Sequence, residues 1–245
     1  MVEAGVHYNP HLSVDCVIFG FTGDQLKVLL VERINTKPAQ KTKHKLPGDL
    51  IHILEDLNGA AERILYELTG LKNIFLHQFS VFGNPDRMSN EEDRNWLEES
   101  SGLTINRVVT TAYFSLIGID NSNSKNEIKN NASWHDINAL PELAFDHAEI
   151  IRDGLESLRK EIRYEPICFE LLPEKFTIRE IQVLYEVILG QQLDNRNFRK
   201  KLLKAEYIEP LNIRQKGVAH KPAMYYTFNK DIYEGRNKEQ SFYNF

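Results

Sequence analysis

Residues 48–71 read GDLIHILEDLNGAAERILYELTGL. Gly48 lies at the start of this stretch and Gly70 near its end, and a helical pattern lies between them. Apolar side chains recur there at the spacing of one helix face, at Leu57, Ala61, Ile64, Leu65 and Leu68. Asp56 or Asn58 can cap the start of such a helix, and Gly70 can end it. The segment therefore predicts one amphipathic helix that follows an extended run.

β-rich segments surround this helix. Residues 11–21 (HLSVDCVIFGF) and 26–33 (LKVLLVER) predict a hairpin across a Gly/Asp turn. Further strands are predicted over 73–83, 107–119 and 132–137, and a second strong helix over 143–162. The polar stretch 84–106 is expected to be a long surface loop. Together these elements predict an α+β domain over residues 1–162.

The composition is that of a globular protein. The 245 residues are 42% hydrophobic and 27% charged, and the length is comfortable for two domains. The longest apolar runs are too short to cross a bilayer, and residues 1–10 lack the pattern of a signal peptide. We therefore expect a cytoplasmic protein with no membrane partner. Cys16 and Cys168 lie in apolar stretches without metal-ligand spacing, so buried reduced thiols are expected.

Charge is distributed unevenly along the chain. The net charge is −5, which argues against a general polyanion binder. Residues 190–230, however, hold nine basic and three acidic side chains, a local charge of +6 that leaves −11 for the rest. A basic module attached to an acidic body calls for a functional explanation.

The basic module has the pattern of a winged helix-turn-helix. Two prolines interrupt the helical pattern in residues 163–175, which predicts a linker. Beyond it, Thr177 and Glu180 form a capping-box pattern, and Gly190 ends the helix. A second helix within 193–208 and a hairpin within 209–229 follow, so the predicted winged-helix domain covers residues 176–245.

The second helix of this module is basic on one side, while Phe198, Leu202 and Leu203 are expected to point inward. Arg196 and Asn197 are expected to reach base edges, because Arg suits guanine and Asn suits adenine. The expected phosphate and wing contacts are Arg199, Lys200, Lys201, Lys204, Arg214, Lys216 and Lys221. A merely solvated charged face, or a winged helix that binds a protein partner, are the alternatives.

The helix segment resembles the signature of the Nudix family. Glu55, Arg63, Leu65, Glu67, Gly70 and Leu71 match it, and Gly48 lies one residue early. The resemblance implies a Nudix α/β/α sandwich. Two signature carboxylates are replaced by Ile64 and Leu68, and magnesium needs oxygen ligands, so no catalytic residue, metal or cofactor is expected. The alternative is an active hydrolase of ADP-ribose or a related diphosphate, with Glu55 and Glu67 gathering magnesium.

The whole chain resembles a subfamily, the Nudix-related transcriptional regulators of the NrtR type. The resemblance rests on FGNPDR (82–87), AFDHAEII (144–151), YEPICFELLPEKFTIREIQVLYEVILG (164–190) and LDNRNFRKKLL (193–203). It implies a homodimer that represses transcription from a palindromic double-stranded operator and responds to a small-molecule effector. The sequence looks most like the branch that controls L-arabinose utilisation (AraR), so L-arabinose is the expected effector. An ADP-ribose-sensing regulator of NAD metabolism is the alternative.

Polar residues on the elements that line a Nudix cleft are candidates for the effector site. They are Asp15, Lys45, Asp49, Glu67, Tyr113, Asp146 and His147. Converging carboxylates and a lysine would orient sugar hydroxyls, which both donate and accept hydrogen bonds. Surface solvation or helix capping is the plain alternative for each, and Glu67 could instead pair with Arg63. The helix 143–161 and the linker 163–175 are expected to connect the effector site with the DNA-binding domain and to carry the change in relative domain orientation.

Overall fold

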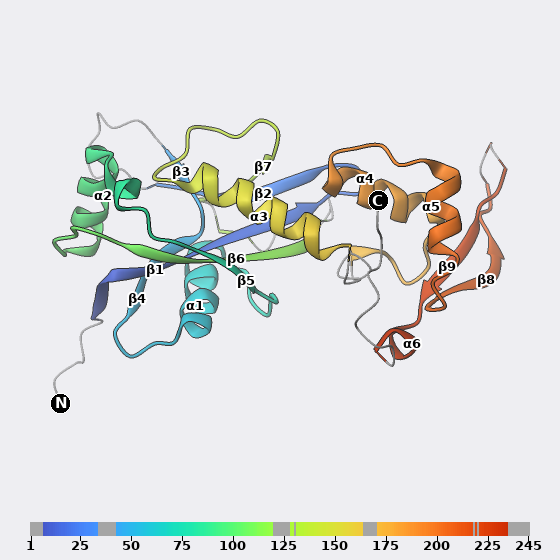
Figure 1. Cartoon of the computed structure of the whole chain (residues 1–245), viewed down its shortest axis with the longest axis horizontal. Coiled ribbons are helices and arrows are strands. Elements are labelled where there is room, and N and C mark those ends of the chain that lie inside the picture. The colour runs from blue at the N-terminus through green and yellow to red at the C-terminus, as the bar shows by residue number, and fades with distance from the viewer. Residues whose placement is uncertain are drawn as a thin grey trace. The chain divides into compact units, whose positions relative to one another are not determined.

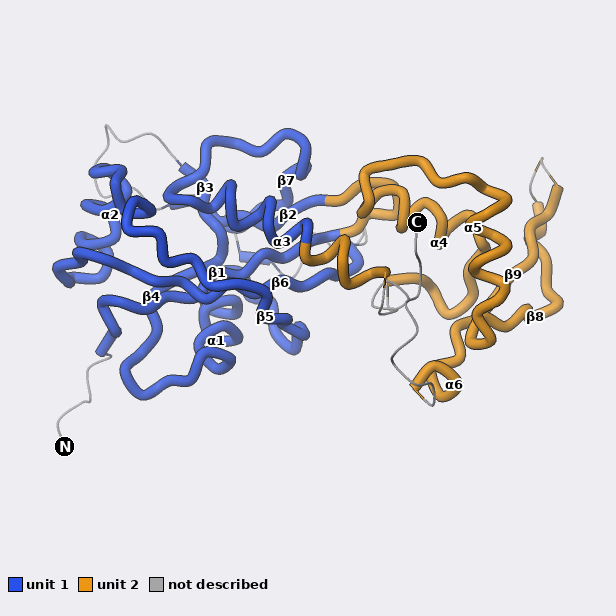
Figure 2. The backbone as a smooth tube through the Cα atoms, in the orientation of Figure 1, with its two compact units in different colours: residues 1–20, 27–156 blue, residues 21–26, 157–245 orange. Residues whose placement is uncertain are grey.

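The computed structural model describes residues 7–33, 43–119, 128–129, 131–163, 171–217, 219 and 221–234. The chain divides into two compact units, residues 1–20 with 27–156 and residues 21–26 with 157–245 (Figure 2). The predicted linker, 163–175, lies partly outside the described residues, so the predicted domain limits stay a prediction. The same holds for the burial of Cys168.

Unit 1 is built around a seven-stranded sheet (Figure 1). The strand order is β3-β2-β1-β6-β5, with β4 paired to β1 and β7 paired to β2. The strands are β1 (Tyr8–Phe21), β2 (Leu26–Glu32), β3 (His44–Lys45), β4 (Gly48–His52), β5 (His77–Phe82), β6 (Val109–Gly118) and β7 (Ala132–Asp136). The predicted strands are thus confirmed.

Helix α1 (Leu57–Thr69) forms as predicted. The Asp56 carboxylate accepts a hydrogen bond from the Gly59 N–H at 2.8 Å, and Gly70 takes the left-handed conformation with φ of 83°. Only a residue that tolerates positive φ ends a helix in this way without strain. Both capping residues are recognisable in the sequence, and for this reason the predicted ends of the helix agree with the observed ones.

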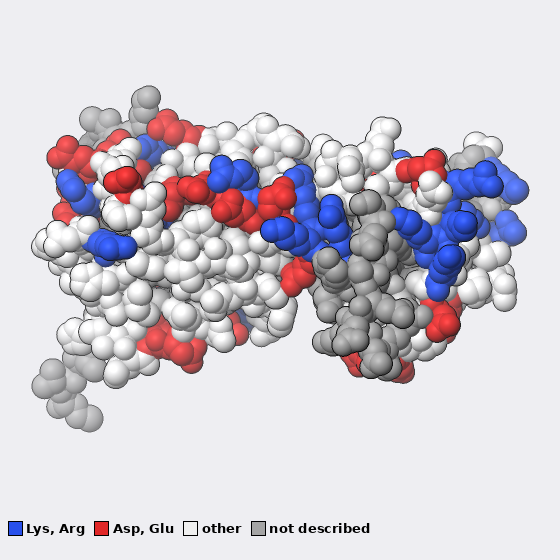
Figure 3. All heavy atoms as spheres, in the orientation of Figure 1, with Lys and Arg blue, Asp and Glu red and all other residues white. Residues whose placement is uncertain are grey.

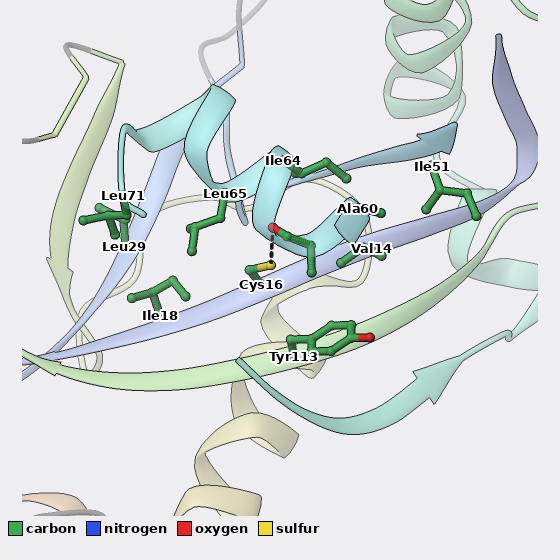
Figure 4. Packing of buried hydrophobic residues seen from close by; sticks show 11 residues of the cluster. Val14, Cys16, Ile18, Leu29, Ile51, Ala60, Ile64, Leu65, Leu71 and Tyr113 are labelled. Carbon is green, nitrogen blue, oxygen red and sulfur yellow. Dashed lines mark hydrogen bonds between the residues drawn. The ribbon is translucent and has the colours of Figure 1, made fainter. Parts of the chain in front are cut away.

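The two faces of the sheet are covered by different helices. On one face, Ile64 and Leu65 of α1 pack against Cys16 and Ile18 of β1 (Figure 4). The Cys16 thiol points at the Ala61 carbonyl, 3.9 Å away, and burial raises its pKa, so the predicted reduced buried thiol is confirmed.

On the other face lies α3 (His147–Glu161). A Cβ on its Gly154 would come within 3.3 Å of Phe79 and 3.4 Å of Val17, so the helix backbone approaches the sheet closely there. Because Val17 alternates with Cys16 along β1, it points to the opposite face from α1. The arrangement is the predicted α/β/α sandwich.

The expected loop over 84–106 is wrong. The segment contains a 3-10 turn, η1 (Pro85–Met88), and helix α2 (Glu91–Ser101). Asn90 caps α2 by accepting from the Asp93 N–H, and Gly102 ends it with φ of 69°. These caps were legible in the sequence. The pattern did not predict a helix because α2 has few apolar residues and is held in place by buried charges.

Unit 2 contains α4 (Ile178–Leu189), α5 (Asn195–Leu202), β8 (Ile208–Arg214), β9 (Met224–Phe228) and α6 (Lys230–Glu234). The Thr177–Glu180 capping box and the Gly190 terminator of α4 are confirmed. β8 and β9 form the predicted hairpin, and Phe176 bridges to Tyr226 on β9. This is the predicted winged-helix arrangement, two helices followed by a hairpin.

Two details of α5 differ from the sequence prediction. Phe198 and Leu202 are buried as expected, but Leu203 is 43% exposed and follows the end of the helix. The helix also ends earlier than the pattern suggested, since Leu203 caps it. No helix in the described part of the chain is long and apolar enough to cross a membrane.

Candidate effector pocket and DNA-binding surface

A pocket of about 370 Å³ lies in unit 1. Strands β1, β2 and β4 and the segments around η1, α2 and the start of α3 form its wall. The apolar part of the wall includes Leu50, Met88, Trp96, Leu97, Val108 and Phe145. Leu50, Met88 and Val108 belong to one buried cluster against which Phe145 and Leu97 pack. One side of the pocket is therefore formed by packed apolar side chains, and the other side is formed by charged groups.

Four of the seven predicted effector residues line this pocket, namely Asp15, Lys45, Asp49 and His147. Asp146 does not line it, but it pairs with Arg87, which does. The remaining two predicted residues, Tyr113 and Glu67, point elsewhere.

The Tyr113 hydroxyl donates to Asn58 at 2.9 Å, and its ring packs in the core beneath α1. Burial raises the pKa of this phenol. Glu67 accepts a hydrogen bond from Arg63 at 3.0 Å and is largely exposed. Glu67 could either contact a ligand or pair with Arg63 four residues earlier, and in the structure it pairs with Arg63.

Buried charges link the floor of the pocket to the start of α3. Arg87 donates from Nε and Nη2 to the two carboxylate oxygens of Asp146, each at 2.9 Å. Its Nη2 also lies 3.6 Å from Asp15, whose other oxygen is 3.4 Å from His147 Nε2. Burial lowers the pKa of Arg87, but its hydrogen bond to Asp146 and the charge of Asp15 outweigh burial and raise it.

His147 and Lys45 are both buried against this network. The Leu46 N–H donates to His147 Nδ1 at 2.9 Å, so neutral His147 carries its proton on Nε2, toward Asp15. Burial lowers the pKa of His147. Burial also lowers the pKa of Lys45, whose ammonium donates to the Gly48 carbonyl, although Asp49 and Asp15 act in the opposite direction.

Gly48 lies directly opposite Asp15 in the β1–β4 pair. A Cβ on this glycine would lie 1.9 Å from Asp15 Oδ1 and 2.8 Å from the Val14 carbonyl oxygen. The glycine at this position is thus required by the close approach of the Asp15 carboxylate.

A second group of buried charges positions α2, and the sequence prediction missed it. Arg33 donates to Asp93 at 2.6 Å and to Glu92 at 3.0 Å, and Lys43 donates to Asp93 at 3.1 Å. The Arg33 guanidinium carbon also lies 5.4 Å from the centre of the Trp96 ring. The Lys43 pKa is lowered by burial but raised overall by its bonds to Asp93. These contacts fix Trp96 in the pocket wall.

The signature helix does not present a metal site. Both oxygens of Glu55 accept from Arg63, at 2.7 Å each, and the Arg63 hydrogen bonds lower the pKa of Glu55. Ile64 is fully buried in the core, and Leu68 packs beside it. Within the described residues, no group of three or more His, Cys, Asp or Glu side chains can hold a metal ion. The donor set does not fit the magnesium ions of a Nudix hydrolase.

The second candidate surface lies on unit 2. Figure 3 shows Lys and Arg gathered over α5 and the β8–β9 hairpin. The predicted DNA contacts on these elements are all exposed: Arg196, Asn197, Arg199, Lys200, Lys201, Lys204, Arg214, Lys216 and Lys221. Asn197 is in the first turn of α5, where its N–H donates to Asp194 at 2.8 Å. Arg199 also lines a depression of about 500 Å³ shared with α4 and β9, together with Arg179.

Comparison with known proteins identifies the family. A NUDIX domain model matches residues 9–154, and a model of the NrtR DNA-binding winged helix domain matches residues 168–228. The ADPR responsive transcriptional repressor NtrR of Acinetobacter baylyi is 30% identical over 230 residues, covering 92% of this chain and 85% of its own. The chain belongs to the NrtR family of Nudix-related transcriptional regulators. The predicted fold and family are thereby confirmed.

Two further relatives bear on this NrtR-family chain. The crystal structure of Shewanella oneidensis NrtR complexed with a 27mer DNA is 27% identical, with a TM-score of 0.67, over 89% of this chain and 93% of that one. An ADP-ribose pyrophosphatase of Methanocaldococcus jannaschii is 29% identical over 60% of this chain and 75% of its own. The predicted arabinose branch finds no support in these relatives.

Proposed function

We propose that this chain is a DNA-binding transcriptional repressor whose Nudix domain senses ADP-ribose. The observation that carries the proposal is its similarity, over 92% of the chain, to a repressor that is named as ADP-ribose responsive. ADP-ribose, an alternative effector in the sequence analysis, therefore replaces L-arabinose.

The pocket supports a nucleotide-sized effector. Its volume of about 370 Å³ is within the range for sites that enclose molecules of drug size, roughly 300–1,000 Å³. A bare pentose has no apolar part to cover Leu50, Met88 and Val108, whereas an adenine base does. On the polar side, Lys45 and Asp15 offer a cation and a carboxylate to phosphate and ribose hydroxyl groups.

The signature helix supports a sensor rather than a hydrolase. Glu55 and Glu67 are both occupied by Arg63, and the neighbouring positions carry Ile64 and Leu68. A protein that binds the effector without hydrolysing it responds to the effector concentration alone, which then sets the fraction of the protein that is bound to effector.

The basic surface of α5 and the hairpin supports DNA as the partner of unit 2. Two copies of the chain on a palindromic operator are part of this proposal. Arg196 and Asn197 are assigned to base edges and the lysines of α5 to phosphates. Accordingly, Lys200→Ala should weaken binding to every duplex and reduce the salt slope by about 0.9, the contribution of one phosphate contact in B-DNA. Asn197→Ala should lower affinity for the operator and leave random duplexes nearly unaffected.

The test uses the full chain and a duplex that it selects from a random library. The expected result is tight binding to the selected duplex, weaker binding to an unselected duplex of equal length, and release of the selected duplex by ADP-ribose. Thermal shift with ADP-ribose, AMP and L-arabinose reports the effector directly, because a ligand of the folded state raises the melting temperature. A shift with L-arabinose and none with ADP-ribose would refute the proposed effector.

The similarity to an ADP-ribose pyrophosphatase makes hydrolysis the second candidate. Magnesium-dependent release of AMP from ADP-ribose measures it. Robust turnover that Glu67→Gln abolishes would make the chain an enzyme and overturn the proposal.

A further inference from the structure

Arg87 lines the pocket, yet its guanidinium is already paired with carboxylates of the protein. Two of its nitrogens donate to Asp146, and one also approaches Asp15 at 3.6 Å. The remaining nitrogen, Nη1, has a long contact of 3.5 Å to the Val108 carbonyl oxygen. The planar guanidinium fork that pairs with a carboxylate also matches a phosphate.

A diphosphate that enters the pocket meets a lining with three carboxylates and only two cations, which already has a net negative charge. Lys45 and Arg87 supply the positive charge of the lining, and Asp15, Asp49 and Glu32 supply the negative charge. An added dianion in a largely buried site requires that a carboxylate withdraws or that a cation enters with it. The site must therefore rearrange when it binds a diphosphate.

Of the two carboxylates beside Arg87, Asp146 is the one that can withdraw. Asp15 lies in the middle of β1, with a side chain 6% exposed, Gly48 against it and His147 at 3.4 Å. The Asp146 side chain is 14% exposed and directly precedes α3. Asp146 is thus the more exposed of the two, and Asp15 is the more closely confined by its neighbours.

We propose that Arg87 reads the diphosphate of the effector by exchanging partners, from Asp146 to a phosphate, and so releases the first turn of α3. This inference rests on the proposed effector. Residues 147–156 of α3 belong to unit 1 and residues 157–161 to unit 2. A change at Asp146 is thus made at the start of the helix that continues into the unit with the DNA-binding surface.

The exchange is tested with Asp146→Asn, which keeps the shape of the side chain and removes its charge. Because ADP-ribose no longer competes with a carboxylate, it should bind this variant on the order of tenfold more tightly than wild type. The variant without effector should already bind the selected duplex more weakly, and ADP-ribose should weaken it further by a smaller factor than in wild type, as linkage requires.

Glu149→Gln is the matched control, since it removes a carboxylate from the same helix, and among the described residues that carboxylate has an ion pair only with exposed Arg152, at 3.5 Å. It should leave both affinities unchanged. Arg87→Lys, which keeps the charge but not the fork, should lose affinity for ADP-ribose by about tenfold and keep its affinity for adenosine. The split between these two ligands distinguishes phosphate reading from a loss of folding.

Isothermal titration with ADP-ribose and anisotropy with the labelled duplex give the affinities. If Asp146→Asn binds ADP-ribose no more tightly than Glu149→Gln does, while wild type still responds to ADP-ribose, partner exchange is wrong and the proposed function stands. Partner exchange is also wrong, and the proposed function again stands, if wild type needs magnesium to bind ADP-ribose and Asp146→Asn leaves the affinity for ADP-ribose unchanged. If wild type binds the duplex but not ADP-ribose, the proposed effector fails and the inference fails with it.

Discussion

Replacing Gly48 by alanine should damage both the stability and the effector pocket of this protein. The added Cβ would lie 1.9 Å from Asp15 Oδ1, and Asp15 is the direct partner of Gly48 in the β1–β4 pair. To reach ordinary contact, the carboxylate must move by more than an ångström, which changes its distances to His147 and Arg87. Overpacking of this kind costs about 1–3 kcal/mol, which for a chain of this size lowers the melting temperature by roughly 2–4 °C per kcal/mol.

The matched control is Gly59→Ala, in the first turn of α1. There the nearest atom to an added Cβ is Asp56 Oδ1 at 3.5 Å, an ordinary contact. Alanine favours the helix by about 0.5–1 kcal/mol over glycine, so this variant should melt above wild type. Differential scanning fluorimetry compares the two, and titration with ADP-ribose should show a weaker pocket in Gly48→Ala alone. Equal melting temperatures and equal affinities in both variants would refute the close approach of Gly48 to Asp15.

Other variants probe the remaining contacts. Thr177→Ala removes the capping box of α4 and should cost about 1 kcal/mol in urea unfolding. Asp93→Ala removes the buried carboxylate that Arg33 and Lys43 share and leaves them with the more exposed Glu92; it should cost about 3 kcal/mol, the lower end for breaking a buried pair, seen as a lower urea midpoint. Because the pKa of His147 is lowered in the folded protein, the unfolded chain takes up the extra proton at a higher pH. The contribution of neutral His147 to the free energy of unfolding is therefore complete above pH 6.5 and is lost as the pH falls below that value. In His147→Asn, the melting temperature should depend less on pH between pH 6.5 and 5.

The elements that the sequence predicted well are those whose signals are local. Asp56, Gly70 and the Thr177 capping box are within a few residues of the helix ends that they set, so the pattern located α1 and α4. The pairing of Arg63 with Glu67 follows from one turn of helix, and it is one of the two roles that the sequence allows for Glu67.

What the sequence missed depends on contacts between distant parts of the chain. Arg87 and Asp146 are 59 residues apart, and Arg33 and Asp93 are 60 apart. Helix α2 is polar along most of its length, and only those buried pairs explain why it packs. Tyr113 lies in the core beneath α1 rather than in the pocket lining, because its position on β6 does not reveal in the sequence which face of the sheet it points to.

The start of α3 gathers three separate contacts in consecutive residues. The Phe145 N–H donates to Asp93 at 2.9 Å, Asp146 pairs with Arg87, and His147 accepts from the Leu46 N–H. Phe145 also has φ of 54°, a conformation that costs a bulky residue free energy and needs its neighbours to hold it.

These contacts reach α2, η1 and the β3–β4 connection, three different parts of the pocket wall. Because one short segment connects all of them to α3, a ligand that alters any one contact alters the start of the helix. A ligand shifts an equilibrium between two arrangements only by the difference in its affinity for the two. In the proposed mechanism, the site that binds the effector and the start of the helix that responds to it therefore share these residues.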